Sequence, residues 1–275
     1  CYPAILLICQ LINAIQSGKY DPHKEALVIT QTGGGCRASN YIHLLRKALE
    51  KAGLSFVPVI SLNLSGLESN PGFQLTVGML RKVVFAIIYG DLILNVSNQV
   101  RPYELTEGDT DACVRSCMDF LLSDMHQGKG MSFKSMKANF RRIIDAFKAI
   151  PVSQEKKVLV GVVGEIYVKY APLGNNNLCD FLLSEGAEPV VPGVMDFIIF
   201  KVNNRSVDVN IYGGKWIKEK FCLWLEKYLM KYQHAMIDAL KESGRFRAPG
   251  DFHDLHRGIQ RYLGDRNKMR EGSLL

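Results

Sequence analysis

The chain has 275 residues, of which 47% are hydrophobic and 22% are charged. This composition is typical of an ordinary globular protein with one large or two modest domains, and it argues against intrinsic disorder. The longest apolar stretch, residues 83–94, falls short of the roughly 18 residues that a membrane span needs, so we expect no membrane association.

The net charge of +7 raises the question of a nucleic-acid partner, since Lys and Arg neutralise phosphates. The basic residues occur in scattered pairs, such as Arg46 with Lys47, and no basic tract develops. We therefore expect no nucleic-acid partner, whereas a partner with phosphates or carboxylates would need only one local basic pocket. The seven cysteines lack the spacing of a small disulfide framework, which indicates a reducing, cytoplasmic setting and leaves metal or catalytic roles open.

The first predicted element is a helix over residues 4–15, where apolar residues recur at helical spacing. Pro3 suits the first turn of this helix, and Cys1 lies immediately before it. Because the chain begins with Cys1 rather than Met, we expect it to be a segment of a longer protein.

A strand, a loop and a helix follow between residues 25 and 52. The apolar run at residues 26–29 predicts a short buried strand, and residues 41–52 have helical spacing and end at Gly53. A second buried strand is predicted at residues 56–60. This β-α-β order predicts a parallel sheet with a right-handed crossover.

The loop between this strand and helix permits three interpretations. It contains three consecutive glycines, which allow positive φ and a close approach of the backbone to a bound group: Gly33, Gly34 and Gly35. Gly33, Gly35 and Ala38 fit the G-x-G-x-x-G/A pattern that seats a pyrophosphate at a helix N-terminus, although this pattern is weak alone. Alternatively, Cys36 lies near the positive end of a helix dipole and beside Arg37, which favours the thiolate that binds a metal or cluster. The third interpretation is a tight turn with an inert thiol.

The middle of the chain is helical by pattern, and Ser132 is placed to cap its last helix. Cys113 and Cys117 share one helical face with apolar residues, which favours a place in the core over a metal site. Cys9 and Cys222 likewise fall on apolar helical stripes. The helices are predicted over residues 73–88, 91–100, 110–125 and 132–149.

A second β-loop-α unit begins with a strand at residues 158–163. Glu165 follows this strand, at the end where open α/β sheets bind ligands. It is an acid-base group, a hydrogen-bond partner to the asparagines that follow, or a structural tie to backbone amides. Three asparagines then cap a helix that begins near Leu178, and their amides can also donate to a carbonyl or phosphate. They are Asn175, Asn176 and Asn177.

The remainder of the chain is predicted as strands and two helices. Residues 189–192 indicate a short strand, residues 197–202 fit a strand or a helix, and alternation over residues 207–211 favours a strand. Helices are predicted over residues 215–243 and 252–263.

These elements predict an α/β fold in three parts. Residues 1–105 form a first α/β unit with the glycine-cysteine loop, residues 106–152 form a helical segment, and residues 153–275 form a second α/β unit with long C-terminal helices.

Three motifs in combination carry a family resemblance. They are CYPA at residues 1–4, QTGGGCRASNYI at residues 31–42, and GEIYV at residues 164–168 followed by Pro172 and the three asparagines. Together they resemble the 2-hydroxyacyl-CoA dehydratase D-component family, most closely the long fusion proteins that join an acyl-CoA dehydratase activase to a dehydratase-like region. The resemblance covers most of the chain.

The resemblance implies a Rossmann-like or flavodoxin-like fold with parallel sheets flanked by helices. It also implies an oxygen-sensitive iron-sulfur cluster of the 4Fe-4S kind, which receives an electron from an ATP-hydrolysing activase in the same polypeptide. The electron would drive radical removal of water from an acyl-CoA, a lyase reaction under anaerobic conditions.

Transferred to this sequence, the resemblance makes Cys1 and Cys36 candidate cluster ligands. Glu165, as the candidate catalytic group, and the three asparagines would line the adjoining pocket. Two thiolates cannot fill the usual set around a cluster, so we expect this chain alone to hold no intact cluster and to turn over no substrate. A binding module that recognises a nucleotide or CoA through the glycine loop, without redox chemistry, is the alternative, and a purely scaffolding role is a third possibility.

Overall fold

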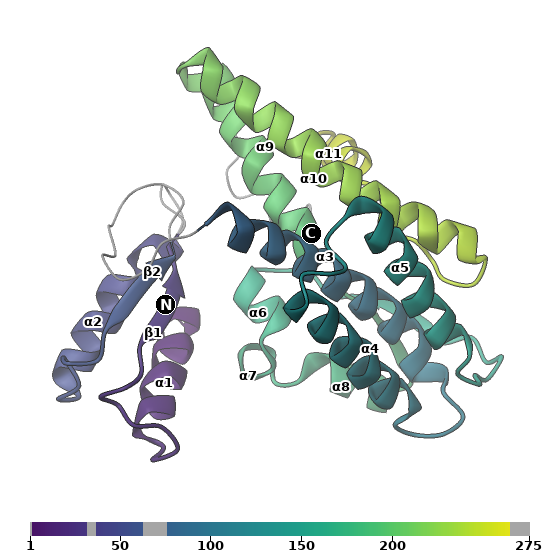
Figure 1. The fold of residues 1–275 in the computed structure, drawn as a ribbon, viewed down its shortest axis with the longest axis horizontal. Coiled ribbons are helices and arrows are strands. Elements are labelled where there is room, and N and C mark those ends of the chain that lie inside the picture. Colours follow the sequence, from purple (N-terminus) through teal and green to yellow (C-terminus); the bar gives the residue numbers. More distant parts are fainter. Residues whose placement is uncertain (1, 32–36, 63–75, 265–275) are drawn as a thin grey trace. The chain divides into compact units, whose positions relative to one another are not determined.

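The computed structural model describes residues 2–31, 37–62 and 76–264 (Figure 1). These residues are mostly helical and contain two parallel sheets of two strands each, which is compatible with the predicted α/β class. The chain divides into two compact units. The first comprises Cys1–Thr76 and Ala171–Asn176, and the second comprises Val77–Tyr170 and Asn177–Leu275. The predicted boundaries at residues 105 and 152 both fall inside the second unit.

The first unit is a β-α-β arrangement with its own core. Its elements are α1 (Tyr2–Gln16), β1 (Leu27–Thr30), the short 3-10 helix η1 (Arg37–Asn40), α2 (Tyr41–Lys51), β2 (Val59–Leu62) and the short α7 (Pro172–Asn175). Strands β1 and β2 pair in parallel, with Leu27 opposite Val59 and Thr30 opposite Leu62, which confirms the predicted parallel pair. The core gathers apolar side chains from α1, β1 and α2, among them Ile8, Ile29 and Leu45.

Strand β2 begins three residues later than predicted. The Val57 amide donates to the Leu54 carbonyl, so the chain is still in a turn at that point. The Pro58 carbonyl then accepts from the Leu27 amide, which is the first bond between the two strands. The apolar residue at 56 therefore lies before the sheet and not within it.

The second unit is a helical assembly that carries the other sheet. Its helices are α3 (Val77–Val100), η2 (Arg101–Tyr103), α4 (Asp109–His126), α5 (Phe133–Lys148), α6 (Ile166–Tyr170), α8 (Leu178–Ser184), α9 (Val194–Tyr212), α10 (Trp216–Ser243) and α11 (Phe252–Ile259). Its strands, β3 (Val158–Gly161) and β4 (Ala187–Val190), pair in parallel. One large core joins α3, α4, α5, α9 and α10, and Phe85, Phe140 and Phe200 are fully buried in it.

The predicted strand at residues 207–211 is wrong, because helix α9 runs through these residues. Figure 1 shows α9 and α10 as an antiparallel hairpin, and α9 buries Ile199 and Phe200 in the shared core. Val207, Val209 and Ile211 favour a strand by propensity, but propensity is a weak preference that packing against a neighbouring helix overrides. Residues 197–202, which fitted either element, belong to the same helix.

The remaining helix predictions are confirmed within a few residues, except that residues 73–75 of one predicted helix lie outside the described residues. The apolar residues at 77–100 form one continuous helix, α3, where two segments had been considered. No helix in the described parts of the chain combines the length and apolar character that a membrane crossing requires.

Candidate functional site

The glycine-cysteine loop was the first predicted site, and most of it lies outside the described residues. This holds for Cys1, Gly33, Gly34, Gly35 and Cys36. Arg37 is the first residue of η1, which leads directly into α2, and α2 begins at Tyr41 as predicted.

The residues on either side of this loop are held together by one buried side chain, Gln31. Its Nε2 donates to the Ser39 carbonyl over 3.1 Å, and its Oε1 accepts from the Ser61 hydroxyl over 2.9 Å. Gln31 and Ser61 are both buried. This amide therefore joins the end of β1, the 3-10 helix η1 and strand β2. The Ser39 hydroxyl is also buried and has no hydrogen-bond partner among the described residues.

Glu165 caps the short helix α6. Its Oε2 accepts from the backbone amides of Tyr167 and Val168, at 3.1 and 3.2 Å. This is the structural tie that the sequence offered as the alternative to an acid-base role, and a carboxylate here also suits the positive end of the helix. The tie uses one oxygen of the carboxylate, and the catalytic role of Glu165 stays a prediction.

The three asparagines turn the chain between α7 and α8. Asn176 and Asn177 have consecutive left-handed conformations, with φ of 56° and 54°. Asn177 occupies the N-cap position of α8, but its side chain makes no capping hydrogen bond, so the predicted cap is wrong for this residue. A capping side chain normally extends from a residue in the β region, and asparagine tolerates the left-handed region better than most residues. Asn175 is the last residue of α7, and a role for these amides in ligand binding stays a prediction.

The cysteines in the described part of the chain do not form a metal site. Cys117 is buried in the core beside Cys113, as predicted, and burial raises the pKa of Cys117 to about 12, so it is a thiol at neutral pH. Cys222 is buried, whereas Cys9 is exposed on α1, contrary to its expected place on an apolar stripe. Within residues 2–31, 37–62 and 76–264, no three His, Cys, Asp or Glu side chains gather around a common point that could hold a metal ion.

A buried ionic cluster in the second unit was not predicted from the sequence. It consists of Asp91 on α3, Lys169 on α6 and Asp196 on α9, which are each at most 5% exposed. The Asp91 carboxylate accepts from the backbone amides of Val194 and Met195 at 2.8 and 2.7 Å, and so caps the start of α9. Asp196 accepts a short hydrogen bond from Gln233 on α10.

The backbone beside this cluster is fitted closely to the Asp91 carboxylate. A Cβ atom added to Gly193 would lie 2.6 Å from Asp91 Oδ2, which is closer than two such atoms can approach. Tyr170, next to Lys169, donates from its hydroxyl to the Pro192 carbonyl over 2.5 Å. The turn between β4 and α9 is therefore fixed from two sides by side chains of other elements.

Burial is the main influence on both carboxyl groups. It raises the pKa of Asp91 to about 6, against the opposing effect of the two backbone amides and of Lys169. It raises the pKa of Asp196 to about 7, where the hydrogen bond from Gln233 opposes it and the charge of Asp91 adds to it. The side chains of Lys169, Asp91 and Asp196 carry no net charge in total when the two carboxyl groups hold one proton between them. In the sequence, the feature that could have indicated this cluster was Asp91, which lies inside the apolar run of residues 83–94.

Comparisons with known proteins do not add a relative. No family model matches the chain, and no match was found among curated proteins or solved structures.

Proposed function

We propose that the chain is part of an iron-sulfur-dependent protein of the 2-hydroxyacyl-CoA dehydratase type, with Rossmann-like or flavodoxin-like sheets. In this proposal the intact protein accepts an electron from an ATP-driven activase in the same polypeptide. Cys1 and Cys36 are the thiolates that this chain would contribute. Glu165 and the asparagines at 175–177 would line the pocket for an acyl-CoA.

The parallel pair of β1 and β2 is the observation that supports the proposal. Ligands in open α/β sheets bind beyond the carboxyl ends of parallel strands, and the glycine-cysteine loop follows β1 directly in the sequence. Gln31 fixes the residues before and after that loop to β2. The Ser39 hydroxyl lies three residues after Cys36, is buried and has no partner within the described ranges. It is therefore a polar group that a bound cofactor could satisfy.

The donor set of this chain fits only part of a cluster. Two cysteines provide half of the usual four thiolates, and the described residues contain no further metal-binding group. The remaining ligands would come from other segments of a longer protein. No reaction step is therefore assigned to the cluster in this chain.

The proposal is tested by anaerobic expression of a longer protein that contains this chain, followed by iron and sulfide analysis. We expect Cys1→Ala and Cys36→Ala each to lower the iron content and the broad visible absorption. Cys9→Ala is the matched control, because Cys9 is exposed on α1 and should leave the iron content unchanged.

Iron content that is the same in all three variants would refute the cluster assignment. A colourless protein whose melting temperature rises with CoA or a nucleotide, by mass action, would instead support the non-redox binding module.

A further inference from the structure

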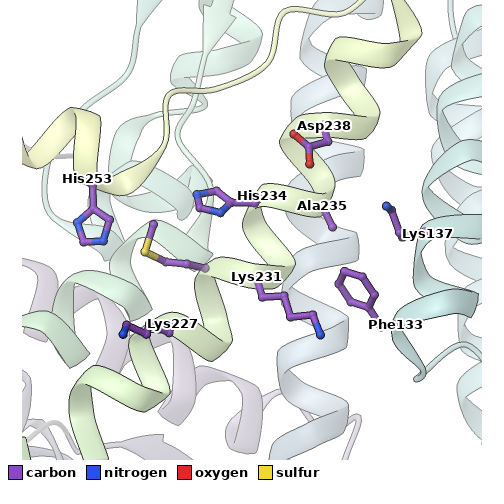
Figure 2. Close-up of a pocket in the computed structure, with 9 residues that line it drawn as sticks. Phe133, Lys137, Lys227, Lys231, His234, Ala235, Asp238 and His253 are labelled. Carbon is purple, nitrogen blue, oxygen red and sulfur yellow. The ribbon is translucent and has the colours of Figure 1, made fainter. Parts of the chain in front are cut away.

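A groove of about 460 Å³ lies in the second unit, between α5, α10 and α11 (Figure 2). One face of α10 forms its long wall, with Lys227, Lys231, His234 and Asp238 spaced at successive helical turns. Helix α5 contributes Phe133 and Lys137, and α11 contributes His253. This volume is within the range of small-molecule sites in proteins.

Three lysine side chains in the groove have no carboxylate partner among the described residues. They are Lys137, Lys227 and Lys231. Two of their ammonium groups lie over the same aromatic ring, at 4.4 Å for Lys231 and 5.8 Å for Lys137 from the centroid of Phe133. Figure 2 shows Lys231 reaching along the groove toward that ring. The ammonium groups of Lys231 and Lys137 are therefore held close together at this end of the groove.

The two imidazoles of the groove are each oriented by a carboxylate that does not line it. His234 Nε2 lies 2.8 Å from Asp251 Oδ2, and His253 Nε2 lies 3.4 Å from Glu226 Oε1. Asp251 also caps α11 through the backbone amides of His253 and Asp254. These two carboxylates are each paired with an imidazole, and among the residues that line the groove the three lysines outnumber Asp238.

The groove also has an apolar part, which a simple anion would not use. Met230 and Ala235 are buried at its base, and the ring of Phe133 is half-buried at one end. A ligand that matches both parts carries a phosphate group and an aromatic or apolar group. Figure 2 shows Phe133 near Lys231 and Lys137, so these two parts of the ligand would lie next to each other.

We propose that the groove between α5, α10 and α11 binds a small phosphorylated organic molecule. Lys227, Lys231 and Lys137 contact its phosphates, and Phe133 packs against its organic part. This site is separate from the glycine-cysteine loop and does not depend on the function proposed above.

The test is calorimetric titration of the whole chain with three probes: ATP, AMP and inorganic pyrophosphate. We expect ATP to bind, and the double variant Lys227→Ala, Lys231→Ala to weaken its binding about tenfold or more, since hydrogen bonds to charged groups are the strong ones. Lys241→Ala is the matched control, because Lys241 is exposed on the same helix outside the groove and should leave the affinity within about twofold.

Phe133→Ala separates the two parts of the ligand. It should weaken ATP and AMP and leave pyrophosphate unchanged if the ring packs against the organic group. Pyrophosphate binding as tight as ATP binding in the unmodified chain would overturn the organic part of the proposal. Absence of binding by all three probes, or equal losses in the double variant and in Lys241→Ala, would overturn the site itself. Circular dichroism of each variant verifies that it is folded.

Discussion

Asp91 and Asp196 are two buried acids that share one buried cation, Lys169. Their roles differ because their hydrogen-bond partners differ. Both oxygens of Asp91 accept from backbone amides at the start of α9, whereas Asp196 meets the side-chain amide of Gln233. An asparagine amide can replace the Asp196 carboxyl, because its oxygen still accepts from Gln233. In place of Asp91, its NH2 group would point at a backbone N–H.

The raised pKa of Asp196 predicts a pH-dependent stability. Between about pH 4 and pH 7 the folded chain keeps a proton that the unfolded chain, with a pKa near 3.8, has lost. The stability contributed by this group therefore falls as pH rises through that window, with a slope of at most about 1.4 kcal/mol per pH unit. Asp196→Asn should remove this dependence, so its stability relative to the unmodified chain rises from pH 4 to pH 7. Urea denaturation across this pH range measures it.

Two variants control this prediction. Asp119→Asn changes an exposed aspartate on α4 and should differ from the unmodified chain by the same amount at every pH. Asp91→Asn should destabilise by about 1–3 kcal/mol, because a buried backbone amide loses its acceptor. A stability difference between Asp196→Asn and the unmodified chain that does not change with pH would contradict the raised pKa of Asp196.

At the scale of elements, α5 shows how a helix start is encoded. The Ser132 side chain accepts from the Ser135 amide over 3.1 Å, and Ser135 Oγ accepts from the Ser132 amide over 3.0 Å. This reciprocal pair satisfies two amides that the helix itself leaves unpaired. The helix then buries Met136, Phe140, Ile143 and Phe147 along one face.

Ser132→Ala should lower the free energy of unfolding by about 1 kcal/mol, since the hydrogen bond from the Ser135 amide to its hydroxyl is lost. Chemical denaturation monitored by circular dichroism measures the change. Ser123→Ala, on the exposed last turn of α4, provides the comparison and should cost less. An equal cost for the two serines would show that the cap contributes nothing specific.

Most of the helices could be predicted because their apolar faces, caps and stops are local in the sequence. Helix α5 is the clearest case, with Ser132 at its start. Helix α9 could not be predicted from residues 207–211, since its conformation depends on contacts with α10, which are not local. The left-handed backbone at Asn176 and Asn177 was also not predicted. This conformation explains why asparagine occurs at these two positions.

The candidate sites were predictable to different degrees. The capping role of Glu165 was among the interpretations, because its partners are two and three residues away. The cluster of Asp91, Lys169 and Asp196 was not, because its members come from three distant helices. The groove was not predicted from the sequence either, since its walls are helices whose residues are far apart in the chain.

At the scale of the whole molecule, the two units have separate hydrophobic cores. The first core is built from α1, β1 and α2 with the residues that lead to β2, and the second from α3, α4, α5, α9 and α10 with flanking residues. A large-to-small change in one core removes packing only within that unit. The two units should therefore respond independently to such changes.

Leu45→Ala and Phe140→Ala test this independence, because both side chains are fully buried, one in each core. Each change should cost about 2–5 kcal/mol in its own unit. Hydrogen exchange measured by mass spectrometry should show faster exchange in α2 for the first variant, and faster exchange in α3 and α5 for the second. Faster exchange throughout the chain in either variant would show that the units unfold as one.

Neighbouring residues on α10 connect the groove to the ionic cluster. Gln233 donates to Asp196, while His234 lines the groove and is bonded to Asp251, whose charge contributes to the raised pKa of Asp196. A ligand anion near His234 has the same sign as Asp251, so it would push the Asp196 equilibrium further toward the neutral acid. Proton uptake would then accompany ligand binding, and by thermodynamic reciprocity acidification would tighten the complex.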